Sequence, residues 1–404
     1  MDKRLVFHVD VNSAFVSWEA TRRVLEGLPD IRLVPSIVGG DPCSRTSIVA
    51  AKSIPAKKYG INTGEPVSMA LRKCPNLVIA KPDFNLYKEY SKAFKDICRE
   101  YAPQVEEFSI DECFLDMTGT GLIYPDPVKT AHEIKDRIRR ELGFTVNVGV
   151  GNNKLLAKMA SDFEKPDKVH TLWQEEIPTK MWPLPVGDLL FVGKKTVPAL
   201  QRAGVRTIGD LAKFDMEFLT HIVGEKAAFY LHNSANGIDD SPISSEPEEA
   251  KGYSISTTVE ENIVSFETGY RILLRLCDQV AARMRKDEVR AYCVAVTIRD
   301  TEFRNQSHQR NLPDSTDITA EIYEVAKELF EVLWDGHTPL RLMRVALSNI
   351  DRGGEEQVSL FVDEQKEKQK KMDRAMDQIR DKFGKNMVQR GTTLNLNERP
   401  RSKE

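Results

Sequence analysis

Three acidic residues lie at the end of, or within, apolar segments, where an uncompensated carboxylate is costly. Asp10 follows the apolar run 5–9, and Asp111 and Glu112 lie in the middle of the predicted strand-turn-strand segment 105–117. Hard divalent cations such as Mg²⁺ offset this cost, because they accept carboxylate oxygens together with substrate phosphates. Two such ions can activate a hydroxyl group and stabilise charge on a transferring phosphoryl group. These carboxylates are therefore a candidate two-metal site.

Taken alone, the carboxylates leave other interpretations open. An Asp-Glu dipeptide is usually a solvated turn, and an Asp after a strand is usually a helix cap. The same chemistry could serve the cyclisation of a nucleotide on a similar sheet. Residues 3–9 alternate as a strand that ends at Asp10, and Asn12 and Ser13 are predicted to cap the helix that follows.

The elements that must position the carboxylates form an α+β domain. Besides strand 3–9 and hairpin 105–117, periodicity predicts strands over 35–38, 47–51, 77–80 and 144–150, and helices over 85–101, 128–142 and 154–163. This order indicates one sheet domain into which residues of about 16 to 76 are inserted.

The second half of the chain changes character. After residue 185, short helices broken by glycines are predicted, and the Asp-, Ser-, Pro- and Glu-rich segment 239–251 is predicted to be an interdomain linker. A second α+β unit follows, with strands over 253–259, 290–300 and 341–349 and helices over 266–286 and 319–333. The charged segment 363–382 is predicted to be a short amphipathic helix.

Two motifs resemble those of the Y-family DNA polymerases, the translesion class, and within it the DinB class, bacterial polymerase IV. The first is Phe7-His8-Val9-Asp10-Val11-Asn12-Ser13-Ala14-Phe15, and the other is Ser109-Ile110-Asp111-Glu112-Cys113-Phe114-Leu115-Asp116. The resemblance extends from about residue 3 to residue 361. It implies that Asp10, Asp111 and Glu112 are the catalytic metal ligands, with the Val11 carbonyl as a further ligand. The implied cofactor is a pair of Mg²⁺ ions, which Mn²⁺ could replace.

The resemblance also implies the fold and the activity. The fold is α+β, a multidomain right hand of palm, fingers and thumb plus a little-finger domain. The implied domains are palm (1–15 and 77–168), fingers (16–76), thumb with a helix-hairpin-helix-like element (169–240), linker (241–250), little finger (251–352), and clamp-binding peptide with charged tail (353–404). The implied activity is DNA synthesis past damaged template bases, with low fidelity and no proofreading.

An aromatic residue five positions after the first Asp excludes the ribose 2′-hydroxyl in this family, by steric conflict. Phe15 takes that place and is the predicted steric gate, with Ala14 beside it in the nucleotide site. Without the resemblance, Phe15 would fit equally well as a helix residue packed in the core.

The triphosphate-binding residues depart from the family pattern. Ile54 and Lys57 stand where the family has Tyr and Arg, so a hydroxyl and a bidentate guanidinium are lost while the charge is kept. The later Lys-Pro pair is retained, which makes Lys165 the predicted phosphate contact. Lys158, earlier in the same segment, is interpreted as a lysine that could be solvated.

Two regions are predicted to hold DNA. Residues 190–196 with 204–211 resemble a helix-hairpin-helix, which offers backbone N–H groups and lysines to a phosphate. Its predicted contacts are Gly193, Lys194 and Lys195. Phe191 occupies the place of a usual glycine, and a glycine-broken helical pair without a DNA role is the alternative. In the second α+β unit, Arg299 and Arg304 are predicted DNA contacts, and Arg310 flanks the same polar strands.

The segment Gln357-Val358-Ser359-Leu360-Phe361 resembles the peptide by which bacterial polymerases dock on the sliding clamp. In such a peptide, Leu360 and Phe361 would fill a groove and Gln357 would set the register.

Composition excludes several other classes. The 404 residues are 41% hydrophobic and 29% charged, without an apolar run long enough for a bilayer or a signal-peptide pattern, so a cytoplasmic protein is expected. Six scattered cysteines and seven histidines lack the spacing of a zinc site or a disulfide framework. The net charge of −3 does not by itself indicate a nucleic-acid binder.

The predicted protein is a monomeric polymerase whose partners are primer–template DNA, deoxynucleoside triphosphates and a sliding clamp. One rival is a clamp- and DNA-binding accessory protein with weak or no polymerase activity, because Ile54 and Lys57 weaken the triphosphate site. A palm-type nucleotide cyclase is a second rival, although it would need neither the hairpin nor the clamp peptide.

Overall fold

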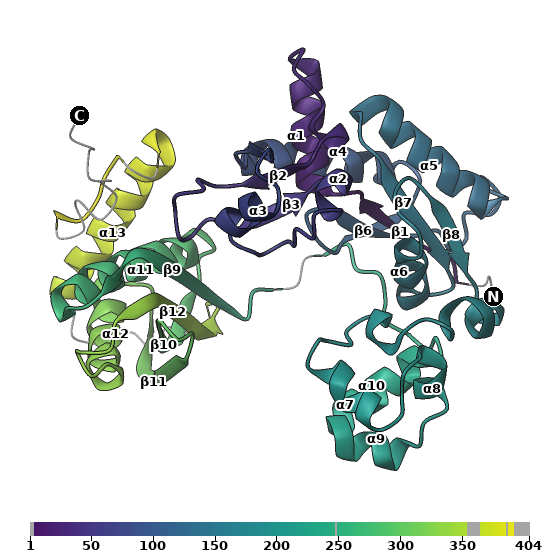
Figure 1. Ribbon diagram of the computed structural model, residues 1–404. Coiled ribbons are helices and arrows are strands. Elements are labelled where there is room, and N and C mark those ends of the chain that lie inside the picture. Colours follow the sequence, from purple (N-terminus) through teal and green to yellow (C-terminus); the bar gives the residue numbers. More distant parts are fainter. Residues whose placement is uncertain (1–3, 247–248, 354–363, 385–386, 392–404) are drawn as a thin grey trace. The chain divides into compact units, whose positions relative to one another are not determined.

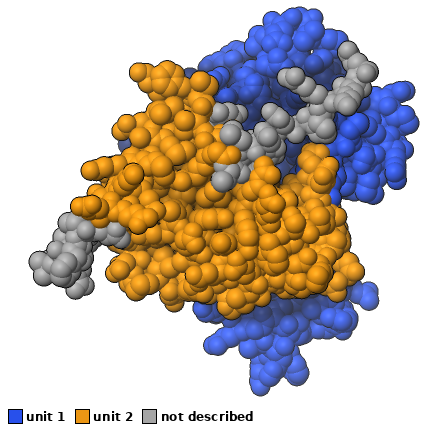
Figure 2. All heavy atoms as spheres, turned by 90° about the vertical axis from the view of Figure 1, so that its left-hand side faces the viewer, with its two compact units in different colours: residues 1–247 blue, residues 248–404 orange. Residues whose placement is uncertain are grey.

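The computed structural model describes residues 4–246, 249–353, 364–384 and 387–391. The chain forms two compact units, residues 1–247 and residues 248–404, each with its own hydrophobic core (Figures 1 and 2). Within the described residues, no helix combines the length and the apolar character needed to cross a membrane.

A five-stranded sheet forms the centre of the first unit, in the order β5-β6-β1-β7-β8. Its strands are β1 (Val6–Val11), β5 (Gln104–Glu107), β6 (Glu112–Asp116), β7 (Val146–Gly151) and β8 (Val169–Leu172). All neighbours pair antiparallel except β7 and β8, which are parallel. The predicted strand 3–9 and hairpin 105–117 are therefore present, whereas β8 was not predicted.

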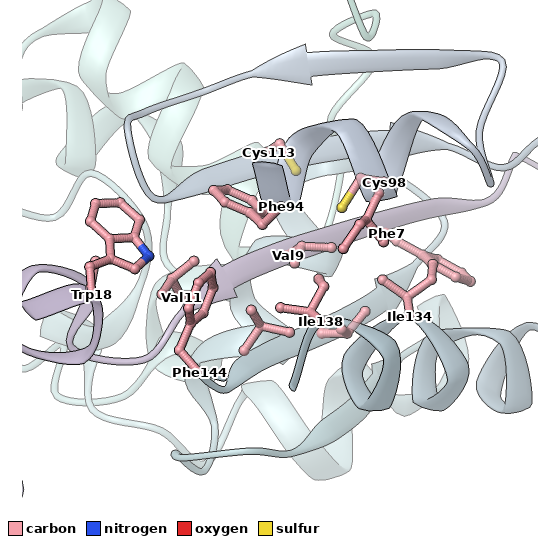
Figure 3. Close-up of a cluster of buried hydrophobic side chains, with 14 of the residues drawn as sticks. Phe7, Val9, Val11, Trp18, Phe94, Cys98, Cys113, Ile134, Ile138 and Phe144 are labelled. Atoms are coloured by element: carbon pink, nitrogen blue, oxygen red, sulfur yellow. The ribbon is translucent and has the colours of Figure 1, made fainter. Parts of the chain in front are cut away.

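Alternation along β1 directs its residues to two different environments. Phe7, Val9 and Val11 join the core formed with the helices α4 (Phe84–Arg99) and α5 (Pro127–Leu142), as Figure 3 shows. The intervening residues Val6, His8 and Asp10 take the opposite face, where α6 (Lys154–Asp162) contacts β1 and β7.

Helix α6 lies unusually close to β7 because two strand residues are glycines. A Cβ atom added to Gly149 would lie 1.9 Å from the carbonyl oxygen of Ala157, and one added to Gly151 would lie 2.9 Å from the Ala157 nitrogen. Any side chain at either position would push the helix away from the sheet. The close packing of α6 on β7 brings the side chains of α6 over the β1 residues that point away from the core.

The inserted segment has a small sheet of its own. It contains α1 (Ala14–Leu25), a 3₁₀ turn η1 (Ile31–Leu33), β2 (Ser36–Gly39), β3 (Val49–Lys52), α2 (Ile54–Lys57), α3 (Val67–Lys73) and β4 (Val78–Ala80), and the strand order is β3-β2-β4. The expected capping of α1 by Asn12 and Ser13 is wrong. Ser13 stands at the N-cap with a φ of 48° and no side-chain cap bond, and Asn12 bonds elsewhere.

Short helices follow the sheet, and those after residue 185 were predicted. They are η2 (Gln174–Glu176), the π-helical turn η3 (Ile177–Met181), η4 (Val186–Asp188), α7 (Thr196–Arg202), α8 (Ile208–Ala212), α9 (Met216–Val223) and α10 (Glu225–Ala235). Their core includes Leu155 and Leu156 of α6. The first part of the predicted linker is not a plain spacer, because Ile243 is buried against Val6 and Phe114 and the Ser244 N–H donates to Glu106 at 3.0 Å.

The second unit is a four-stranded antiparallel sheet with helices, in the order β11-β10-β12-β9. Its elements are β9 (Gly252–Ile263), α11 (Phe266–Lys286), β10 (Arg290–Asp300), β11 (Asn305–Thr316), α12 (Thr319–Leu333), β12 (Leu340–Asp351) and α13 (Glu364–Phe383). Strand β11 escaped prediction because it is a mostly exposed edge strand of polar residues, without apolar alternation.

Candidate active site

The antiparallel register of β1 and β6 brings two of the predicted ligands together. Asp10 lies directly opposite Glu112, so both side chains point to the face that α6 covers. Asp111 precedes Glu112 at the end of the β5–β6 turn, and its carbonyl accepts from the Val11 N–H at 3.0 Å. The Ser109 hydroxyl donates to Asp111 Oδ1 at 2.7 Å. The fold therefore gathers Asp10, Val11, Asp111 and Glu112 at one end of the central strands.

Two lysines compensate the charge of these carboxylates. Lys158 on α6 places its Nζ 2.8 Å from Glu112 Oε1 and 3.8 Å from Asp10 Oδ2. Lys165 forms an ion pair with Asp10 and a second one, at 2.8 Å, with Asp162. The interpretation of Lys158 as a solvated lysine is wrong, since its side chain is buried.

Burial and charge act differently on the two paired carboxyls. Burial raises the pKa of Asp10 to about 6, and the ion pairs with Lys165 and Lys158 only partly oppose this. Burial would also raise the pKa of Glu112, but His8 and Lys158 outweigh it and lower that pKa to about 2. Of these two partners Lys158 is the closer, because His8 Nε2 lies 3.6 Å from Glu112. Burial lowers the pKa of His8 itself to about 4.

The donor chemistry at this end of the sheet fits hard divalent cations. Asp10, Asp111 and Glu112 offer carboxylate oxygens, and the Val11 carbonyl lies beside them in the chain. In the described parts of the chain, no three His, Cys, Asp or Glu side chains are already grouped to hold a metal ion. The ammonium groups of Lys158 and Lys165 supply positive charge to Glu112 and Asp10.

Two asparagines position the segment that carries Lys165. The Asn12 side chain donates to Asn147 Oδ1 at 3.1 Å and accepts from the Asp167 N–H at 2.9 Å. Asn147 donates in turn to the carbonyl of Glu164 at 2.7 Å. These bonds hold the chain on both sides of Lys165 against β7. Asn147 was not predicted as a site residue, although a polar residue within the apolar alternation of β7 was a usable signal.

His8 was likewise not predicted as a site residue. It is a fully buried polar residue in an apolar strand, bonded through Nδ1 to the Ser161 hydroxyl at 2.8 Å. Its ring lies against Phe114, with ring centroids 4.6 Å apart. Because its pKa is low, this imidazole is neutral at pH 7, so the full positive charge beside Glu112 is that of Lys158.

Phe15 lies in a cluster of aromatic rings near the start of α1. Its ring stacks on Tyr87 at a centroid distance of 4.8 Å and an interplanar angle of 13°, and it meets Phe84 edge-on. Ala14 beside it is buried. Phe15 is only partly buried, so one part of the ring packs in the core while another part remains accessible.

The other predicted nucleotide-binding residues are in a different setting. Ile54 and Lys57 are exposed on the short helix α2, where the Ser53 hydroxyl accepts from the Ala56 N–H. Within the described residues, hydrogen bonds and ion pairs connect Lys165 to the carboxylates but do not connect Lys57 to them.

The predicted DNA contacts of the first unit lie in an exposed loop before α7. Gly193, Lys194 and Lys195 are all exposed. Phe191 has a φ of 67°, in the left-handed region that favours glycine. The loop thus adopts a glycine-type conformation at this position although the residue is phenylalanine.

The predicted contacts of the second unit are partly engaged by protein groups. Arg299 donates to Asn305 at 2.6 Å, and Arg304 pairs with Asp300 at 3.0 Å and with Glu302 at 2.5 Å. Arg310 pairs with Glu328. The predicted clamp-binding residues Gln357, Leu360 and Phe361 lie outside the described residues.

Comparisons with known proteins identify the family of the chain. Models described as the impB/mucB/samB family and its C-terminal domain match residues 9–162 and 250–360. The chain is 43% identical to the DNA polymerase IV of Clostridium acetobutylicum over 404 residues, which covers 98% of this chain and 100% of that protein. It is 33% identical to DNA polymerase IV 1 of Bacillus subtilis over 400 residues, with 98% and 94% covered.

A solved structure supports the fold. A Y-family DNA polymerase chimera aligns with 86% of this chain and 100% of its own chain, at a TM-score of 0.75 and 23% sequence identity. These findings confirm the resemblance and the predicted α+β right-hand architecture. The chain therefore belongs to the impB/mucB/samB family, the Y-family DNA polymerases, in the DNA polymerase IV group.

Proposed function

We propose that this protein is a DNA-directed DNA polymerase that extends a primer opposite template DNA, including damaged template bases, at a two-metal site built on Asp10, Asp111 and Glu112. The observation that supports this most directly is the pairing of Asp10 with Glu112 across β1 and β6, beside Asp111, in a member of this family. Synthesis would be of low fidelity and without proofreading.

In this proposal the carboxylates and the Val11 carbonyl hold a pair of divalent cations, Mg²⁺ or alternatively Mn²⁺. When bound, such ions favour ionisation of the primer 3′-hydroxyl and stabilise charge on the transferring phosphoryl group. The reaction joins the 3′-oxygen to the α-phosphorus of the nucleotide and releases pyrophosphate. Lys158 keeps Glu112 ionised, and Lys165 is a partly exposed cation at the edge of the site that can turn toward a triphosphate.

Phe15 is the proposed steric gate. Its stacking on Tyr87 fixes the plane of the ring, and a fixed ring cannot move aside for a ribose 2′-hydroxyl. Ala14 and Lys57 are further proposed nucleotide contacts. Lys57 would act as a point charge only, because the bidentate guanidinium of the family pattern is missing.

The proposed partners are primer–template DNA, deoxynucleoside triphosphates and a sliding clamp. DNA would be held through Gly193, Lys194, Lys195, Arg299 and Arg304, and the clamp would be bound through Gln357, Leu360 and Phe361. The proposed state is a monomer in the cytoplasm.

A clamp- and DNA-binding accessory protein is the rival. It is disfavoured because such a protein has no use for a buried Asp10 whose charge burial opposes. The curated relatives are also named as polymerases.

Primer extension tests the proposal. Wild type, Asp111→Ala and the control Asp96→Asn, whose half-exposed carboxylate pairs with Lys92 and Arg99 on α4, would be compared with Mg²⁺ on undamaged and abasic templates. We expect extension by the wild type and the control and none by Asp111→Ala, because only Asp111 lies beside the Asp10–Glu112 pair. Extension that persists in Asp111→Ala would remove this carboxylate from the mechanism. A wild type that binds DNA but does not extend it, even with Mn²⁺ and clamp, would favour the accessory protein.

A further inference from the structure

The loop before α7 contains a bulky residue where the backbone favours glycine. Phe191 has a φ of 67°, a region that costs a non-glycine side chain free energy through contact with its own backbone. Its side chain is nevertheless 64% exposed, so burial in the core does not offset that cost. A residue held in this way is a reason to look for a function.

Phe191 is not isolated on the surface. Its ring meets that of Tyr230 on α10 edge-on, with centroids 5.7 Å apart, and Tyr230 is itself 43% exposed. Two segments about forty residues apart in the sequence thus build one exposed aromatic pair. Edge-on contacts of this kind fix the relative orientation of the two rings.

Exposed cations flank the pair on both segments. Lys194 and Lys195 follow Phe191 in the loop, and Lys226 precedes Tyr230 by one helical turn on α10, so it lies on the same side of that helix. Flat apolar rings bordered by lysines complement a nucleic-acid strand, in which apolar sugars alternate with anionic phosphates.

We propose that Phe191 and Tyr230 pack against the deoxyribose groups of bound DNA, as an uncharged contact beside the lysines that bind its phosphates. This inference rests on the proposed DNA-binding function of the loop. A hairpin with glycine at this position holds DNA through its backbone and charges alone. The phenylalanine adds apolar contact area that does not depend on salt.

Salt-dependent DNA binding of the full chain provides the test. Fluorescence anisotropy with a primer–template duplex would be measured over a series of NaCl concentrations. The proteins would be wild type, Phe191→Gly, the double variant Lys194→Gln/Lys195→Gln, and Phe218→Ala. Phe218, 68% exposed on α9, is a matched control.

We expect Phe191→Gly to weaken binding about fivefold to tenfold at every salt concentration, because it removes an aromatic ring but no charge. Its plot of log affinity against log salt should keep the wild-type slope. Its unfolding midpoint should not fall, since glycine suits a φ of 67°. The lysine double variant should reduce the slope by about 0.9 for each phosphate that a lysine no longer neutralises. Phe218→Ala should bind as wild type does.

Different results would contradict the aromatic contact and the proposed DNA-binding function. Wild-type affinity in Phe191→Gly, with a reduced slope in the lysine variant, would overturn the aromatic contact and leave the hairpin proposal standing. A smaller slope in Phe191→Gly would also overturn it, because the ring would then act only by positioning the lysines. Tyr230→Ala, which leaves the loop untouched, should bind DNA more weakly with an unchanged salt slope. If this variant kept the wild-type affinity, Tyr230 would not be part of the DNA contact. Absence of DNA binding by the wild type would instead refute the proposed function.

Discussion

In the first unit, the buried carboxylate of Asp10 and the partly buried one of Glu112 face lysines, whereas in the second unit buried and partly buried aspartates face arginines. The second group, called here the arginine cluster, joins α11, α13 and residue 390. Its members are Asp278, Asp373, Asp377, Arg285, Arg380 and Arg390. Arg285 bonds Asp377 at 2.6 Å, Arg380 bonds Asp278 at 2.7 Å, and Arg390 pairs with Asp373, which is 2% exposed.

The difference lies in how completely the charge of Asp10 is compensated, since its neighbour Glu112 has a pKa lowered to about 2. Burial would lower the pKa of Arg285, but the bond to Asp377 and the charge of Asp373 outweigh it and raise that pKa. At Asp10 burial prevails, and the pKa rises to about 6 in spite of two lysines. Arginine forms fixed, directional bonds to carboxylates, while a lysine is a flexible point charge.

When lysines do not fully compensate the charge of a carboxylate, another cation can replace them. A carboxylate bonded by arginines is suited to hold two helices together. We therefore interpret the first group as a ligand site and the arginine cluster as a structural contact between α11 and α13. Four substitutions test this contrast.

Replacing Asp10 by Asn should have the largest effect, on activity. Primer extension is expected to fall by about 10³-fold or more, because one oxygen ligand loses its charge. The free energy of unfolding should change by less than about 1 kcal/mol, since burial opposes the charge of Asp10 while Lys158 and Lys165 keep their ion pairs with Glu112 and Asp162. Steady-state extension and urea unfolding measure the two quantities. A large loss of stability without metal would contradict the interpretation of Asp10 as a ligand.

Replacing Asp373 by Ala should act on stability. Arg285 and Arg390 would each lose one of two aspartate partners, and the Thr319 N–H would lose its bond of 2.8 Å to Asp373. Breaking a buried network of this kind costs about 3–5 kcal/mol. Urea unfolding of the full chain, with hydrogen exchange to localise the change to residues 248–404, provides the measurement. A cost below about 1 kcal/mol would show that the arginine cluster contributes little to holding α13.

Replacing Lys158 by Met should produce a smaller, cation-dependent effect. Without divalent cations, Glu112 and Asp10 would lose compensation, at a cost of about 1–3 kcal/mol in unfolding free energy. Added Mg²⁺ should recover part of this loss, because a bound cation can take over the role of the ammonium group. Arg285→Met is the matched control, and Mg²⁺ should not rescue it. If Mg²⁺ stabilised both variants equally, the proposed difference between the Asp10–Glu112 carboxylates and the arginine cluster would be contradicted.

Replacing Glu328 by Gln should have the smallest effect. Its ion pair with Arg310 joins two exposed side chains, and pairs of this kind contribute less than about 1 kcal/mol. Thermal unfolding of the variant sets the baseline for the other three. A loss of stability as large as that of Asp373→Ala would mean that burial does not explain the strength of the arginine cluster.

Much of the fold followed from periodicity. Helices 266–286 and 319–333 and strand 290–300 were predicted with the bounds that the structure has, because long amphipathic segments carry a strong local pattern. Strand β11 was missed because an exposed polar edge strand has no such pattern. Its pairing with β10 depends on residues elsewhere in the sheet.

At the site, the carboxylates and Lys165 remain predictions, whereas the solvated environment considered for Lys158 is wrong because its side chain is buried. No local pattern distinguishes a buried lysine from a solvated one on a helix. Asn12 was expected to cap α1 and instead bonds Asn147 and the Asp167 N–H, more than one hundred residues away. Contacts between segments so far apart in the sequence cannot be predicted from local sequence patterns.

Local alternation was enough to predict that Asp10 lies near the end of an apolar strand. Which residues are expected to bind cations and phosphates followed from the resemblance of their motifs to a known family. The position of Lys158 beside Glu112 depends instead on the packing of the fold, since it requires Gly149 and Gly151 to admit α6 against β7. The arginine cluster depends on packing in the same way, because its aspartates and arginines lie on two different helices and at residue 390. Charge compensation in a protein interior depends on distances across the fold, and those are set only when the elements pack.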